Sequence, residues 1–70
     1  MKNARYYLSY LAGFLLENED KELDDSQMDK LDSAWGELSE SEEDFCNNLI
    51  ADYMHGFYTL GQLSEIIESL

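Results

Sequence analysis

The sequence is poor in the residues that build disulfides, zinc sites and histidine-based catalytic sites. Cys46 is the only cysteine and His55 the only histidine among 70 residues, and proline is absent. A lone cysteine suggests a reducing compartment or a buried apolar residue, and we favour the buried residue over an intermolecular disulfide or a reactive thiol. A zinc site needs more cysteine or histidine than this. We therefore expect no disulfide framework and no metal site.

Basic residues are also scarce. The chain has 16 acids against 4 bases, a net charge of −12, and no lysine or arginine from Leu31 to Leu70. Such an excess of one sign repels itself, so it serves either solubility or binding to a basic partner that neutralises it. The same field opposes direct contact with nucleic acid or with an anionic membrane. We expect neither kind of binding.

The apolar content, 44% of the residues, is sufficient for a folded core. Apolar residues recur at helical spacing over residues 3–16, 26–38, 39–54 and 59–70. No stretch shows the alternation and turn pairs of a hairpin. The sequence therefore predicts one all-α domain over residues 1–70, a small bundle of three to four short amphipathic helices. The last two segments form either two helices, with Gly56 just beyond the third, or one helix with a kink there.

Several helix starts carry capping signals. Ser39 with Glu42 and Thr59 with Gln62 both have the spacing of a capping box. Asn3 is a candidate cap of the first helix, and Asp24 or Asp25 of the second. Residues 17–25 are rich in acids but lack the oxygen-ligand spacing of a calcium loop, so we interpret them as a solvated loop.

The stretch from residue 25 to 54 is predicted to organise the fold. It contains two amphipathic segments joined at an acidic corner, with the only tryptophan on the apolar side of the first. The other helices are expected to pack on this pair. The residues expected to share one core are Leu31, Trp35, Phe45 and Leu49.

Catalytic motifs are absent from the sequence. It has no phosphate-binding glycine loop, no dinucleotide fingerprint and no nucleophile elbow. His55 is expected at a helix C-terminus, where the dipole favours it, rather than as a ligand or base. The many carboxylate pairs lack a predicted cleft to hold a substrate. The sequence predicts a chain that is not an enzyme and needs no cofactor.

The acids favour binding to a protein partner with a basic surface. In the strongest form of this hypothesis, carboxylates along helix faces replace nucleic-acid phosphates and occupy the basic groove of a nucleic-acid-handling protein. This predicts a contiguous negative face, to which the acidic loop of residues 17–25 would add. The main candidate contacts are Asp29, Asp32, Glu40, Glu42, Glu43 and Asp44.

The tyrosines support an alternative. Tyr6 and Tyr7 point about 100° apart on a helix, so one apolar stripe cannot bury both, and Tyr6 and Tyr10 are candidate interface residues. The chain would then be an adaptor or a homo-oligomer that binds through an apolar, tyrosine-rich face, with charge for solubility only. The residues proposed for this face are Tyr6, Tyr10, Phe57, Tyr58, Leu63 and Ile67.

Residues 33–45 resemble a pattern found in small acidic proteins of bacteria and phages. In this pattern a helix ends in tryptophan and leucine, and a serine followed by acids opens the next helix. The likeness implies a bacterial or phage-infected cytoplasm and, by analogy, an inhibitor of a nucleic-acid machine. Capping physics alone would also generate this pattern.

Overall fold

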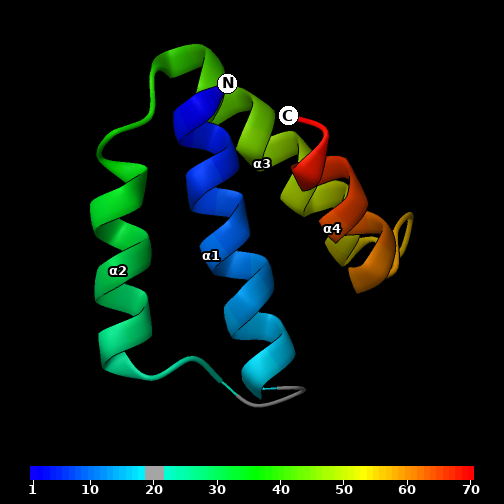
Figure 1. The fold of residues 1–70 in the computed structure, drawn as a ribbon, viewed down its shortest axis with the longest axis horizontal. Coiled ribbons are helices and arrows are strands. Elements are labelled where there is room, and N and C mark those ends of the chain that lie inside the picture. The colour runs from blue at the N-terminus through cyan, green and yellow to red at the C-terminus, as the bar shows by residue number, and fades with distance from the viewer. Residues whose placement is uncertain (19–21) are drawn as a thin grey trace.

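The structure, a computed structural model, describes residues 1–18 and 22–70. Within these residues the chain is all-α, with four helices and no strand. The helices are α1 (Lys2–Asn18), α2 (Asp25–Trp35), α3 (Glu40–Met54) and α4 (Leu60–Glu68). In Figure 1, α1 runs through the middle of the view, with α2 on one side of it and α4 on the other. The predicted fold class is therefore confirmed.

Capping boxes open three of the four helices. Ser39 caps α3 with Glu42, and Thr59 caps α4 with Gln62, as predicted. Asp24 caps α2, and the Gln27 side chain completes a third box that the sequence analysis did not include. Each box satisfies backbone N–H groups that have no partner within the helix. The prediction for Asn3 was wrong, because α1 begins at Lys2 and the Asn3 side chain donates to the carbonyl of Glu37.

Gly56 separates α3 from α4. Its φ is +87°, in the left-handed region that favours glycine. The N–H of Gly56 donates to the carbonyl of Tyr53, and that of Phe57 donates to the carbonyl of Asp52. These two bonds form a Schellman motif, which ends a helix and turns the chain. The two-helix alternative is thus the correct one.

The apolar stripe of α1 forms the centre of the core. Ala4, Leu8 and Ala12 are buried along it, and the other three helices pack mainly against α1. The prediction that α2 and α3 organise the fold was therefore wrong, because α1 is the element that all the others share. The buried cluster also includes Cys46 and Leu49 from α3 and Leu63 and Ile67 from α4.

Helix α2 packs on the opposite side of α1 from α4. Trp35 is half-buried and meets Tyr7 edge to face, with ring centroids 5.2 Å apart. Trp35 and Phe45 pack against the cluster that contains Leu49, as expected, but Leu31 is buried outside this cluster.

Helix α2 ends at Trp35 rather than at residue 38, because Gly36 and Glu37 form a turn.

Side-chain hydrogen bonds hold α2 against α1 at both ends, and at the start of α2 the Gln27 side chain also donates to the Glu17 carboxylate (3.5 Å). The Asn3 side chain donates to Glu37 at the end of α2 (3.1 Å), and that of Asn18 donates to Gln27 at its start (2.8 Å). Gln27 also belongs to the α2 capping box. The helix start and its position on α1 are therefore stabilised by the same side chain.

Substitutions of two glycines should test the turn at Gly56. We expect Gly56→Ala to lower the free energy of unfolding by about 1–2 kcal/mol, because a Cβ is strained at positive φ. Gly61→Ala is the matched control. Its Cβ would lie 3.9 Å from the nearest atom, the Thr59 hydroxyl, in helical backbone, so stability should be unchanged or rise by up to about 0.5 kcal/mol. Urea denaturation measures the free energy of unfolding of both variants. Equal changes in the two variants would contradict the left-handed turn at Gly56.

Candidate functional site

The acids of α2 form a stripe along its outer side. Asp25, Asp29 and Asp32 follow helical spacing, so they lie within about 60° of one another around the helix. All three are exposed, on the side away from the buried Leu31. Their successive separations along the axis are about 6 Å and 4.5 Å. We call these three residues the α2 stripe.

The four acids predicted at the corner do not play one role. Glu40 and Asp44 are exposed and Glu43 is half-buried, all within the first turns of α3. Negative charge is favourable at this end of a helix. These three carboxylates are placed to reach solvent or a partner, whereas Glu42 is already engaged within the chain.

Both oxygens of the Glu42 carboxylate accept backbone hydrogen bonds. Oε1 accepts from the N–H of Ser39 (3.1 Å), within the α3 capping box, and Oε2 accepts from the N–H of Ala4 (2.9 Å). These bonds hold the pKa of Glu42 below the usual range of a glutamate, while partial desolvation acts in the opposite direction. Glu42 therefore joins the starts of α1 and α3, a structural role that the sequence analysis missed.

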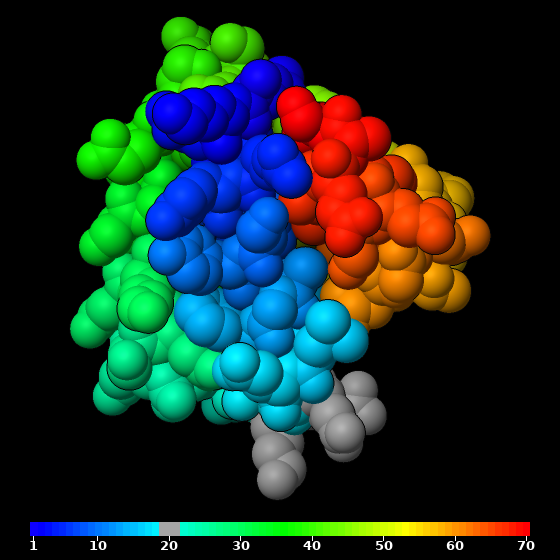
Figure 2. Space-filling view, in the orientation of Figure 1, coloured from blue at the N-terminus to red at the C-terminus, as the bar shows by residue number. Residues whose placement is uncertain are grey.

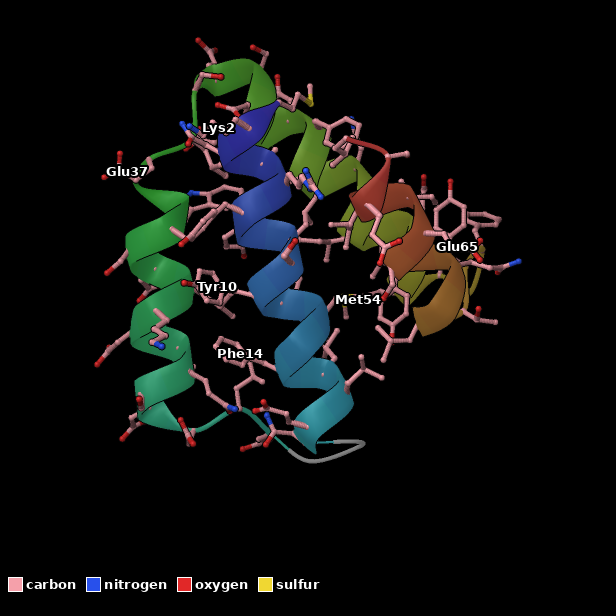
Figure 3. The ribbon with its side chains drawn as sticks, in the orientation of Figure 1. Lys2, Tyr10, Phe14, Glu37, Met54 and Glu65 are labelled. Atoms are coloured by element: carbon pink, nitrogen blue, oxygen red, sulfur yellow. The ribbon has the colours of Figure 1, made fainter. Side chains whose placement is uncertain are left out.

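Tyr6 and Tyr10 lie apart from the corner, at the junction of α1 and α2. Their rings meet edge to face with centroids 5.1 Å apart, and Tyr10 stacks on Phe14 at 5.9 Å. Tyr10 and Phe14 are both seen between the two helices in Figure 3. Tyr6 is 61% exposed, whereas Tyr10 is half-buried.

A groove of about 560 Å³ runs beside these tyrosines, and Asp29 is on its wall. Lys2 and Lys30 line the same groove, and the Lys30 ammonium lies over the Tyr10 ring, 5.8 Å from its centroid. The structure thus brings Asp29, Tyr6 and Tyr10 together, but among bases. Sequence spacing could not show this neighbourhood, because Lys30 and Tyr10 come from different helices.

Carboxylates also occur on the far side of the molecule. Figure 3 shows Glu37 beside the end of α2 and Glu65 on α4, at opposite sides of the view. The negative charge is therefore not confined to one face. The larger group of exposed carboxylates belongs to α2 and the corner.

The residues proposed for an apolar face are separated by the fold. Leu63 and Ile67 are 1% and 3% exposed, within the core, so placing them on a binding surface was wrong. Phe57 is 70% exposed and stacks on the imidazole of His55, with ring centroids 6.4 Å apart, at the turn after α3. Tyr58 is half-buried and packs against the core.

Cys46 is fully buried, as predicted. Burial, with a smaller effect of the Glu42 charge, raises the pKa of the Cys46 thiol to about 11. A thiol in this state is not a nucleophile at neutral pH. Among residues 1–18 and 22–70, no group of three or more histidine, cysteine or acidic side chains is arranged to hold a metal ion. None of the helices described here has the length and apolar content needed to cross a bilayer.

Comparisons with protein families, curated proteins and solved structures found no match to this chain.

A substitution at Glu42 should reveal its structural role through pH. The pKa of the Glu42 carboxyl is lower in the folded chain than in the unfolded chain, so the unfolded chain protonates Glu42 more readily. The stability that the ionised carboxylate contributes to the fold is therefore lost as pH falls through the folded pKa. We expect Glu42→Gln to be less stable than the wild type at neutral pH, with a difference that shrinks in acid. Urea denaturation at a series of pH values from neutral to acidic measures the free energy of unfolding of both proteins.

Glu40→Gln is the control, since it removes the same charge from an exposed residue in the same turn. It should have a smaller effect at neutral pH. Equal losses in the two variants, or a Glu42→Gln deficit that does not vary with pH, would contradict the assigned role.

Proposed function

We propose that this chain acts by binding, without catalysis, and presents the carboxylates of the α2 stripe and the corner to a basic protein surface. The observation that carries the proposal is the α2 stripe, three exposed carboxylates at helical spacing along one side of the helix, of which Asp29 also borders the groove lined by Lys2 and Lys30. Their mean spacing along the axis is about 5 Å, wider than the rise of about 3.4 Å per phosphate along one DNA strand, so the stripe resembles a strand in its row of negative charge rather than in its spacing. Glu40, Glu43 and Asp44 at the start of α3 are proposed to extend the contact.

The partner we propose is a protein that handles nucleic acid, whose basic groove the chain would occupy. A net charge of −12 would speed the encounter with such a groove and make binding strongly dependent on salt. Exposed carboxylates of this kind contribute little individually, about 0.2–1 kcal/mol for each ion pair. The affinity would therefore come from several contacts made together.

Glu42 is left out of this proposal. Its two carboxylate oxygens already accept backbone N–H groups, and turning it toward a partner would break bonds that join α1 to α3. Tyr6 and Tyr10 are also left out, because they carry no carboxylate and line the groove beside Lys2 and Lys30. Asp29 borders the same groove but is an exposed carboxylate of the α2 stripe, so it stays in the proposal.

A displacement experiment tests the proposed mimicry. The proteins of a bacterial lysate are bound to immobilised DNA, and the purified chain is added across a salt series. We expect it to release particular DNA-bound proteins, identified by mass spectrometry, at low and moderate salt, below the salt concentration at which those proteins leave the DNA without the chain. Asp29→Asn with Asp32→Asn should require about ten-fold more protein for the same release, because two contacts are lost.

The control is Glu65→Gln with Glu68→Gln on α4. Both pairs are exposed and three residues apart, and each changes the net charge from −12 to −10. The control should release the same proteins as the wild type. Equal impairment in the two variants would assign the effect to overall charge, and the proposal would fail if the wild type released nothing at low salt.

A further inference from the structure

One face of α1 is left uncovered by the other helices. In Figure 2, α1 runs down the middle of the visible surface, between α2 and α4. Helical spacing places seven residues on or beside this outer face of α1: Lys2, Arg5, Tyr6, Ser9, Gly13, Leu16 and Glu17. All are exposed except Gly13, which is partly covered.

Two large apolar side chains lie on this face, on either side of its small residues. Tyr6 and Leu16 are each 61% exposed. Between them are Ser9 and Gly13, and a Cβ at Gly13 would meet no atom within 4 Å. Packing within the chain therefore does not require glycine at this position, although glycine inside a helix costs about 0.5–1 kcal/mol relative to alanine. A second helix could approach closely there.

Hollows lie beside both apolar side chains. One, of about 580 Å³, is lined by Lys2, Arg5, Tyr6, Ser9 and Tyr10. The other, of about 230 Å³, lies between α1 and α4, next to Gly13 and Leu16. The face thus alternates protruding side chains with spaces that could receive them.

The charges of α1 are reversed relative to its helix dipole. Acids are favoured in the first turn of a helix and bases in the last. Helices α2 and α3 have acids in their first turns, but α1 has none there and has no base in its last turn. Instead Lys2 and Arg5 lie near its start and Glu17 near its end. This arrangement does not help an isolated α1, and it gives the outer face a basic end and an acidic end.

We propose that the outer face of α1 pairs with the same face of a second copy, antiparallel and about a two-fold axis at the level of residue 11. Arg5 then faces Glu17 of the second copy, and Tyr6 faces Leu16 of the second copy. The small residues Ser9 and Gly13 meet at the crossing. One helix face satisfies both sides of such an interface, as two-fold symmetry requires.

Charge complementarity favours a second copy of the chain as the partner that covers the outer face of α1. Two chains of net charge −12 repel each other when acidic faces meet. The outer face of α1 offers its own complement, because reversing its direction places basic ends against acidic ends. Each Leu16 would enter the hollow beside Tyr6 of the other copy, and each Tyr6 the hollow beside Gly13.

Exchange of the two charges tests the direction of pairing. Sedimentation equilibrium is run from micromolar to millimolar chain concentration at physiological salt. We expect a reversible dimer for the wild type. Arg5→Glu and Glu17→Arg should each weaken it by about ten-fold or more, since each dimer contains two such pairs. The double variant keeps the net charge of −12 and should restore dimerisation to within a few fold.

The charge variants also separate association from folding. Arg5→Glu places an acid near the start of α1, which the helix dipole favours, so the thermal unfolding midpoint of the monomer should not fall. Tyr6→Ser should weaken the dimer, whereas Phe57→Ser, at a side chain that is 70% exposed elsewhere, should not.

Any of three results would overturn the inference. These are a wild-type chain that is monomeric at every concentration, a Glu17→Arg variant that dimerises more tightly than the wild type, and a double variant that dimerises as weakly as the two single variants. The experiment contains no DNA and no partner protein. Its failure is therefore independent of the failure of the proposed function.

Discussion

Burial of one apolar stripe on α1 is the constraint on which the other helices depend. Leu8 is fully buried, and the small side chains of Ala4 and Ala12 lie one turn to either side of it along the same stripe. Small residues at these positions let neighbouring helices approach the α1 backbone. Because α2, α3 and α4 each pack mainly on α1, a loss of this stripe would remove the contact that they have in common.

The carboxylates of this acidic chain divide into those used by the fold and those left free. Glu42 joins the starts of two helices, and Asp24 caps a third. Those of the α2 stripe remain exposed. Folding thus uses acids where backbone N–H groups need acceptors, and leaves the α2 stripe exposed, where water and salt screen the repulsion between its charges. In the part of the chain that the structure describes, the bases Lys2, Arg5 and Lys30 lie near Tyr6 and Tyr10.

Two of the three capping boxes were predicted from the sequence, the box that opens α2 was missed, and no long-range hydrogen bond was predicted. The capping boxes at Ser39 and Thr59 were predicted correctly because each depends on residues only a few positions apart. At Gly56 the sequence left a helix end and a kink as alternatives, and the structure shows the helix end. Asn3 was misread because its partner, Glu37, is distant in the sequence.

The same limit applies to the candidate site. The spacing of Asp29 and Asp32 gave their shared face, but the second bond of Glu42, to Ala4, depends on how α3 meets α1. The position of Lys30 over Tyr10 depends on how α2 meets α1. The role of α1 as the common partner was missed for this reason too, since periodicity shows that a helix has an apolar side but not which helices share it.

The burial of Cys46 gives the chain a natural reporter of its own opening. A thiol reagent can reach this side chain only when α1, α3 and α4 separate, because the residue has no exposed surface in the closed core. The chain has no other cysteine, so each label added marks a single opening event. The rate of labelling, compared with that of the unfolded chain, would give the free energy of that opening without any change to the sequence.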